Sequence, residues 1–271
     1  MNMITGKDVL LTEKRGKVFI MTVNREERRN AMSNELSDRM AEEWERFNED
    51  DDLYVAIFTG AGDVAFSSGH DLKEDVEGDV RGGAFKSIPP YQARTPHPMV
   101  PTWKPTIAAV NGYALAGGWA LAQRCDVRIA AESATFGMPE VRWNLPAGFG
   151  AQLEYFQTLG ISAELLMWGR SITAQRAYEI GFVNKVVPHA QLMEEAMEWA
   201  DYMCTLGQPS VKAHKEMIYR GRDMSRSELQ ALGRDLFYWY PAKPGVVIDA
   251  TEGPRAFAEK RGNTSIDFDK K

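Results

Sequence analysis

The sequence is poor in cysteine, in basic charge and in long apolar runs, and each shortage excludes a class of protein. Two cysteines among 271 residues, Cys125 and Cys204, are too few for a disulfide scaffold and lack the spacing of a zinc knuckle. Asp and Glu (38) outnumber Lys and Arg (32), giving a net charge of −6, whereas nucleic-acid-binding domains usually carry a basic surface. No stretch reaches the ~18 consecutive apolar residues of a membrane span, and the N-terminus lacks a signal-peptide pattern. We therefore expect a cytoplasmic protein with reduced thiols that binds neither nucleic acid nor membrane.

The first half of the chain has the pattern of an α/β core. Short apolar, partly β-branched runs predict four buried strands, at residues 18–22, 54–59, 106–110 and 127–131. Ser33 is placed to cap a helix running to about Glu49, whose apolar residues recur every three or four positions. Strands that alternate with helices in this way predict a largely parallel sheet.

The last third of the chain is predicted to be helical. An apolar stripe runs from Leu192 to Leu206, Ser225 and Glu228 have capping-box spacing, and residues 251–260 have the pattern of a short amphipathic helix. We expect a core over residues 1–200 and a helical C-terminal region over 201–271. Residues 74–104 break the pattern with many glycines and prolines. A loop this long is either a functional lid or partly disordered, and we favour the lid.

Two glycine-containing turns follow predicted strands. They are Ala65 to Lys73 (AFSSGHDLK) and Asn111 to Ala122 (NGYALAGGWALA). Such turns are either plain tight turns or places where backbone N–H groups approach a ligand, and two converging N–H groups would form an oxyanion hole. Neither turn has the spacing of a nucleotide-binding fingerprint.

Glu140 is the candidate acid or base. It lies between Met138 and Val141 in a turn held by Pro139. A partly desolvated carboxyl group there would have a raised pKa, in the range useful for proton transfer. The alternative from the residues alone is an exposed loop glutamate.

These segments together resemble the enoyl-CoA hydratase/isomerase (crotonase) superfamily over nearly the whole chain. The motifs run in family order: NREERRNAM at 24–32, SSGHDLK at 67–73, NGYA at 111–114, ATFGMPE at 134–140 and GFVNKVV at 181–187. The tail EGPRAFAEKR at 252–261 is similar to the carnitinyl-CoA hydratase branch, and the core also resembles hydroxycinnamoyl-CoA hydratase-lyases.

The resemblance implies a crotonase-like spiral of repeated ββα units with a helical C-terminal trimerisation region, assembled as a homotrimer or a dimer of trimers. It implies an acyl-CoA thioester substrate, with coenzyme A as part of the substrate and no further cofactor or metal. The backbone N–H groups of His70 and Gly117 would form the oxyanion hole, and the His70 side chain would be a bystander. The resemblance also assigns contacts to CoA or substrate to Arg25, Arg28, Arg29, Ala31, Ser68, Asp71, Leu72, Lys73, Trp119, Phe257 and Lys260.

One position departs from the family pattern. Typical hydratases carry a second glutamate where this chain has Ala120, so Glu140 is the only candidate catalytic carboxylate. A hydratase (lyase) with one glutamate is our first hypothesis. A tyrosine, Tyr240 or Tyr238, would then assist catalysis as in the hydratase-lyases, with His97 as another polar candidate, unless these tyrosines pack at an interface.

Two other functions stay open. A Δ3,Δ2-enoyl-CoA isomerase needs only the glutamate at position 140, and a catalytically silent CoA-binding scaffold needs none. Trp119, beside the missing acid, either narrows the acyl pocket or packs in the core.

Overall fold

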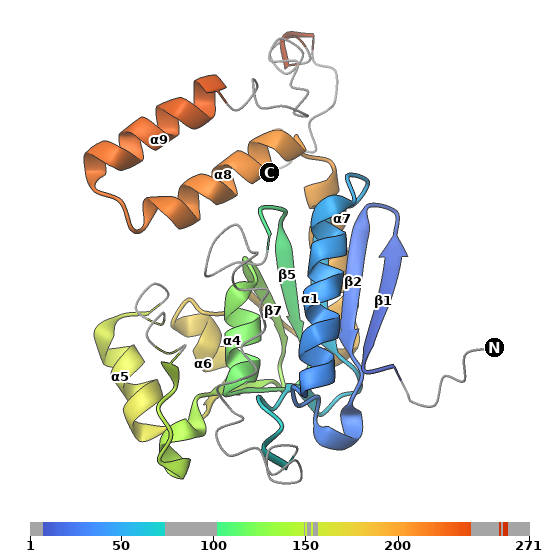
Figure 1. Ribbon diagram of the computed structural model, residues 1–271, viewed down its shortest axis with the longest axis vertical. Coiled ribbons are helices and arrows are strands. Elements are labelled where there is room, and N and C mark those ends of the chain that lie inside the picture. The colour runs from blue at the N-terminus through green and yellow to red at the C-terminus, as the bar shows by residue number, and fades with distance from the viewer. Residues whose placement is uncertain are drawn as a thin grey trace, which may run out of the picture.

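The computed structural model describes residues 8–73, 102–148, 150, 153, 157–239, 255 and 257–259. A six-stranded sheet runs through its centre in the order β1-β2-β3-β5-β7-β10 (Figure 1). All its neighbouring strands pair in parallel except β1, which is antiparallel to β2. The strands are β1 Leu10–Arg15, β2 Val18–Val23, β3 Val55–Gly60, β5 Thr106–Val110, β7 Val127–Ala131 and β10 Lys185–Val187.

A smaller sheet, in the order β4-β6-β8-β9, lies at one end of the first. Its strands are β4 Ala65–Ser67, β6 Tyr113–Leu115, β8 Thr135–Gly137 and β9 Ile172–Thr173. The chain alternates between the sheets three times, since β3 leads to β4, β5 to β6 and β7 to β8. Each passage thus builds one strand of each sheet, which gives the spiral of repeated units that the resemblance implied.

The large sheet is covered on both faces because its central strands β2, β3, β5 and β7 are apolar on both. Phe19, Phe58 and Val110 face one cluster together with α1, whereas Ile20 and Ile57 face a second cluster with α7. This period of two is the natural alternation of a strand.

The helices are α1 Asn34–Glu49, α4 Gly117–Arg124, α5 Leu159–Trp168, α6 Ala174–Glu179, α7 Leu192–Cys204, α8 Gln208–Gly221 and α9 Arg226–Trp239, with short 3₁₀ segments η1 Glu26–Arg28, η3 Pro139–Trp143 and η5 His189–Gln191.

The predicted elements of the core are confirmed with small shifts at their ends. The strands predicted at 106–110 and 127–131 have those bounds, and the other two extend to Val23 and Gly60. Ser33 caps α1, with its Oγ accepting from the Leu36 amide at 3.1 Å. Strands β1 and β10 and the second sheet were not predicted from the sequence.

The helices α8 and α9 form a pair that lies above the sheets in Figure 1. The predicted capping box opens α9: the Ser225 amide donates to Glu228 Oε2 at 2.8 Å, and the Glu228 amide donates to Ser225 Oγ at 3.4 Å. The helix predicted at 251–260 is described only at 255 and 257–259, where residues 255, 257 and 258 are helical. No helix within the described ranges is long and apolar enough to cross a membrane.

Polar contacts fasten α8 to the core. Asp126, just before β7, accepts from Lys215 Nζ at 2.8 Å and from the Tyr219 hydroxyl at 2.9 Å, both on α8. Its Oδ2 also accepts from the amide and hydroxyl of Thr106, at the start of β5. Lys215 donates in addition to the Lys104 carbonyl at 2.9 Å. One carboxylate thus joins the C-terminal helices to two central strands.

Candidate active site

The candidate site lies where three parallel strands of the small sheet end. β4 leads into Gly69 and His70, β6 into Gly117, and β8 into Glu140. Carboxyl ends of parallel strands meet at one edge of a sheet, and open α/β folds bind ligands at that edge. A backbone bond from the Ala116 amide to the Gly137 carbonyl, 2.9 Å long, ties the second segment to the third. Residues far apart in the sequence are therefore neighbours at this edge.

The two glycine turns touch through their main chains. A Cβ placed on Gly117 would lie 3.5 Å from the Cα of Gly69 and 3.7 Å from the backbone nitrogen of His70. Gly117 opens α4, and the first N–H groups of a helix have no partner within the helix. The helix dipole adds partial positive charge at the same point. These contacts place the main chain of Gly117 beside the main chain of Gly69 and His70.

An unusual backbone conformation precedes Gly117. Ala116 has φ 54° and ψ −124°, in a region that non-glycine residues rarely occupy. Such a conformation costs of order 1–3 kcal/mol and persists only where the surrounding structure enforces it. Here the bond from Ala116 to Gly137 holds it in place. The turn gives Gly117 its position at the start of α4.

A short backbone ladder holds His70. The Met32 amide donates to the Gly69 carbonyl at 2.7 Å, and the Asp71 amide donates to the Met32 carbonyl at 2.9 Å. Successive N–H groups of extended chain point to opposite sides, so the His70 N–H points away from Met32. This direction was not predictable from the sequence, because it depends on a residue 38 positions earlier.

Glu140 lies in η3, half-buried, directly after Pro139. Its Oε2 is buried and has no hydrogen-bond partner among the described residues. Burial raises the pKa of this carboxyl group, because the charged form loses solvation, and a bond from its own backbone offsets the effect in part. Of the two alternatives drawn from the sequence, an exposed loop glutamate does not fit this geometry. A partly desolvated carboxyl group with a raised pKa is the kind of group that acts as a general acid or base.

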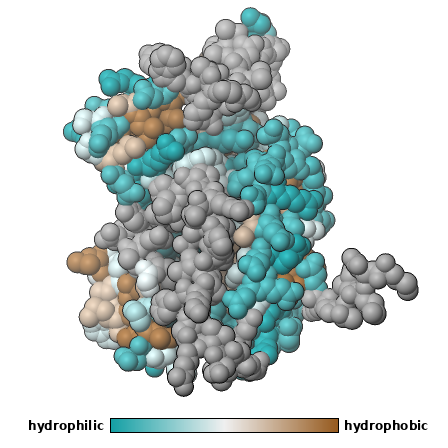
Figure 2. All heavy atoms as spheres, viewed as in Figure 1, coloured by the Kyte–Doolittle hydropathy of each residue, from teal (hydrophilic) through white to brown (hydrophobic). Residues whose placement is uncertain are grey.

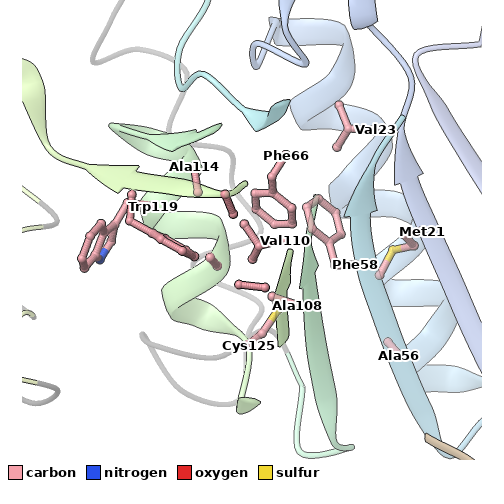
Figure 3. Packing of buried hydrophobic residues seen from close by; sticks show 14 of the residues in the cluster. Met21, Val23, Ala56, Phe58, Phe66, Ala108, Val110, Ala114, Trp119 and Cys125 are labelled. Carbon is pink, nitrogen blue, oxygen red and sulfur yellow. The ribbon is translucent and has the colours of Figure 1, made fainter. Parts of the chain in front are cut away.

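Ala120 and Trp119 lie on different sides of α4. Ala120 is half-buried and three residues after Gly117, so it shares the helical face of the candidate oxyanion hole. Trp119 is 0% exposed, and its ring stacks on Phe182 with centroids 4.2 Å apart. Figure 3 shows Trp119 at the edge of the core that contains Phe66. Packing in the core, one of the two alternatives for Trp119, is therefore the role that the structure shows.

Some of the predicted CoA contacts are held by hydrogen bonds or an ion pair within the protein, and others are exposed to solvent. Arg25 pairs with Asp71 at 2.9 Å and also donates to the Ala31 carbonyl. Ser68 donates from its amide to the Arg29 carbonyl at 3.0 Å and from its hydroxyl to the Arg28 carbonyl at 3.5 Å. The exposed members are Arg29, Leu72, Lys73 and Phe257.

Some predicted residues lie outside the described part of the chain. They are Tyr240, Lys260, His97 and all of the predicted lid except residues 102–104. Tyr238 belongs to α9, but its side chain is not described. Their proposed roles therefore stay predictions. Within the described ranges, no group of three His, Cys, Asp or Glu side chains is placed to hold a metal ion.

Two residues that organise the site were missed. Asn30 donates to the Ala65 carbonyl at 2.6 Å and to the Ala61 carbonyl at 3.0 Å, which fixes the segment at residues 24–32 to β4 and to the loop before it. Met32 bridges His70 and places its Cε against Gly117. Both belong to the NREERRNAM segment, which we had interpreted only as a CoA contact.

Comparison with known proteins gives a consistent answer. The enoyl-CoA hydratase/isomerase family model matches residues 13–266. An enoyl-CoA hydratase of Mycobacterium tuberculosis is 37% identical over 261 residues, covering 95% of this chain and 96% of the relative. A carnitinyl-CoA dehydratase of Proteus mirabilis is 36% identical over 254 residues, covering 91% and 94%. The crystal structure of a Bacillus anthracis enoyl-CoA hydratase superposes with a TM-score of 0.84 at 33% identity, covering 94% of this chain and 97% of that one.

These matches confirm both the resemblance and the crotonase-like fold predicted from it. They span the spiral core and reach into the C-terminal helices, so they do not depend on one motif. The chain therefore belongs to the enoyl-CoA hydratase/isomerase family.

Proposed function

We propose that this protein is an enoyl-CoA hydratase (lyase) that uses one catalytic glutamate, Glu140. The supporting observation is the carboxyl group itself: Oε2 of Glu140 is buried and has no partner among the described residues, at the sheet edge that carries the His70 and Gly117 amides. A buried acceptor without a hydrogen bond destabilises the folded state by about 1–3 kcal/mol, so stability alone does not explain why this carboxyl group is here. Relatives named as enoyl-CoA hydratases support the same reaction, and a relative named as a carnitinyl-CoA dehydratase supports its reverse, the loss of water.

In this proposal the main chain stabilises the charge of the reaction. The thioester oxygen accepts from the His70 and Gly117 amides and becomes negative as water adds to the β-carbon. By analogy with other oxyanion holes, each donor contributes about 3 kcal/mol to stabilising that charge. Glu140 takes a proton from the attacking water and returns one to the α-carbon, so the enolate collapses to the saturated thioester. The reverse sequence eliminates water.

Ala120 supports a second candidate, a Δ3,Δ2-enoyl-CoA isomerase. A methyl group at this half-buried position of α4 transfers no proton and orients no water. Isomerisation needs one base that removes a proton from one carbon and returns it to another, which Glu140 alone supplies. A tyrosine of the C-terminal part, Tyr240 or Tyr238, would be needed only for hydration.

Glu140→Gln tests the role of the glutamate. The variant keeps the size of the side chain and loses the base, so turnover should fall by about 10²–10⁴-fold. Glu132→Gln, which changes an exposed glutamate after β7, is the matched control and should retain full activity. Both would be assayed on 2-enoyl-CoA and 3-enoyl-CoA thioesters and on carnitinyl-CoA. Full activity in Glu140→Gln would overturn the assignment.

The substrate panel separates the reactions. Hydration of a 2-enoyl-CoA supports the hydratase, and conversion of a 3-enoyl-CoA without hydration of the 2-enoyl product supports the isomerase. If CoA thioesters bind and none is converted, the chain is a scaffold. The exposed arginine Arg29 and the exposed Lys73 are our candidates for CoA phosphate contacts, because both side chains carry positive charge.

We also propose self-association into a homotrimer or a dimer of trimers. Figure 2 shows hydrophilic side chains over α1, but apolar ones over α5 at the lower left. There Leu159, Met167 and Trp168 are 83%, 65% and 61% exposed. Apolar side chains gathered on a surface often mark an interface. Light scattering of the purified protein tests the assembly, and a monomer at micromolar concentration would contradict it.

A further inference from the structure

Arg25 and Asp71 form a shielded ion pair beside the candidate oxyanion hole. Their side chains are 13% and 5% exposed, and Arg25 Nη2 lies 2.9 Å from Asp71 Oδ2. Taking two charges out of water costs several kcal/mol each, so a buried pair is weak evidence of a stabilising role. Its position is more informative, because Asp71 directly follows His70, whose amide is a proposed donor to the thioester oxygen.

The guanidinium group spans both sides of the ladder that holds His70. One nitrogen donates to Asp71, and another donates to the carbonyl of Ala31, the residue before Met32. The ladder itself pairs Met32 with His70. Arg25 therefore fixes the distance between residues 31–32 and residues 70–71. That distance sets where the His70 amide lies relative to Gly117.

The base of the Arg25 side chain is itself held. Its amide donates to Asn30 Oδ1 at 3.0 Å, and its carbonyl accepts from the amides of Arg28 at 2.9 Å and Asn30 at 2.8 Å. Asn30 in turn donates to the Ala65 carbonyl in β4, the strand that leads to His70. The turn is thus closed on itself and fixed to the site. A planar guanidinium can make two bonds in set directions, whereas an ammonium group is a point charge.

These contacts also argue against a direct role in CoA binding. The charge of Arg25 is balanced by Asp71, and two of its nitrogens donate to protein oxygens. The neighbouring Arg29 is exposed and has a side chain open to solvent. We propose that Arg25 and Asp71 are a positioning pair, which holds the His70 amide in line with the Gly117 amide, and that the pair does not bind CoA. This inference rests on the proposed function.

The test measures CoA affinity and oxyanion stabilisation separately. Calorimetry gives the Kd for CoA. Acetoacetyl-CoA reports on the oxyanion hole, because its enolate absorbs in the near ultraviolet and forms more readily when donors stabilise the negative oxygen. Turnover of a 2-enoyl-CoA gives kcat. The variants are Arg25→Met, Arg25→Lys, Asp71→Asn and the double variant Arg25→Met with Asp71→Asn, and Arg29→Met is the comparison on the same turn.

For Arg25→Met and Asp71→Asn we expect kcat to fall by at least about tenfold and the enolate band to weaken, since displacing a donor by about 1 Å costs up to 10²-fold. The Kd for CoA should stay within about threefold of the wild type, a free-energy change below ~1 kcal/mol. The double variant should be no worse than either single variant, as expected for two residues that act as one unit. Arg29→Met should show the opposite pattern, with a weaker Kd and an unchanged enolate band.

A Kd for CoA raised tenfold or more (about 1.4 kcal/mol) in Arg25→Met with an unchanged band would overturn the proposal and make Arg25 a CoA ligand. An unchanged Kd, band and kcat would also overturn it. If Arg25→Met fails to fold, Arg25→Lys provides the test. It keeps the positive charge but loses the planar guanidinium with its two directed hydrogen bonds. An enolate band as strong as that of the wild type would then contradict positioning by the guanidinium. A wild-type protein that forms the enolate but hydrates nothing overturns the proposed reaction only, and the band still tests the pair. A wild-type protein with no band overturns both.

Discussion

A Cβ atom on Gly69 would lie 2.8 Å from the Cβ of Ala116 and 3.0 Å from the backbone nitrogen of Gly117. Both distances are shorter than side-chain atoms tolerate, and Gly69 has φ +94°, a conformation that favours glycine. The two turns of the candidate site therefore meet because this position lacks a side chain. Their spacing is a property of the backbone at Gly69 and Ala116.

Gly69→Ala should push the turns apart. We expect an unfolding free energy lower by about 1–3 kcal/mol from the strained φ, and kcat lower by at least about tenfold from the displaced amide. Urea unfolding and steady-state kinetics measure the two effects. The control is Gly160→Ala in α5, where an added Cβ meets nothing within 4 Å. It should gain up to about 1 kcal/mol from helix propensity. Wild-type kcat in Gly69→Ala would contradict the close approach of the turns.

The stability of the protein should depend on pH through Glu140. Burial raises its folded pKa above the unfolded value, so the folded state holds this proton more tightly. Its favourable contribution is complete at pH values below the ordinary glutamate pKa and is lost as pH rises through the raised folded pKa. Glu140→Gln removes the penalty of the charge. The variant should therefore melt at a higher temperature than the wild type at about pH 7.5, by a few degrees, since about 1 kcal/mol shifts Tm by about 2–4 °C.

The same comparison at about pH 3, which lies below the ordinary glutamate pKa and where the wild-type carboxyl is neutral in both states, should show little difference. Glu132→Gln changes an exposed carboxylate and should leave Tm unchanged at both pH values within about 1 °C. Scanning calorimetry provides the measurements. If Glu140→Gln melts below the wild type at about pH 7.5, the carboxylate has a partner that stabilises its charge, and the site as described here is wrong.

Removing the Asp126 carboxylate should loosen the C-terminal helices. Asp126→Asn leaves Lys215, whose side chain is 6% exposed, as a buried charge without its counter-ion. We expect a loss of about 3–5 kcal/mol in the free energy of unfolding. Adding Lys215→Met should restore part of it, since the stranded charge is then gone. Glu195→Gln breaks the more exposed pair with Lys185 and should cost less than about 1 kcal/mol. Equal losses in the two carboxylate variants would refute the anchoring role of Asp126.

Ala120→Glu tests the gap in the family pattern. A glutamate on the face of α4 that carries Gly117 would provide a second carboxylate for hydration. Hydration of crotonyl-CoA should rise at least tenfold, the low side of the ~10²–10⁴-fold effect of one acid or base. Stopped-flow loss of the enoyl absorbance measures it. A folded variant that binds CoA and shows no gain would mean that position 120 does not face the reacting carbon.

The sequence predicted four strands of the large sheet and the helices α1, α7 and α9, for a clear physical reason. Strands such as Val55–Gly60 are buried on both faces and so appear as continuous apolar runs. Ser33 and Ser225 cap helices through bonds within three residues, which local sequence reveals. The family motifs then located Glu140 and both glycine turns, and the structure brings these three segments to one edge of the small sheet.

The second sheet and the frame of the site were not predictable in this way. β4, β6 and β8 have three residues each, too few for a periodic signal. The local sequence predicted that Arg25 binds phosphate. It does not show that Arg25 is paired within the protein, because the partner Asp71 lies 46 positions away. The pKa of Glu140 depends on what buries it, and burial comes from tertiary packing. Local patterns carry neither kind of information.

The proposed oxyanion hole consists of backbone N–H groups, which are present whatever side chain the residue carries. Replacing His70 by almost any other residue would leave its N–H in place. A point mutation reaches this half of the site through residues that shape the backbone, such as Gly69 and Gly117, or through pairs such as Arg25 and Asp71. In the proposed reaction, proton transfer depends instead on the single side chain of Glu140, and position 120 is an alanine where a second acid would stand. The reaction can therefore change by substitution at these two positions while the proposed backbone contacts to the thioester stay the same. Proton transfer and thioester binding are then set by different residues, which evolve independently.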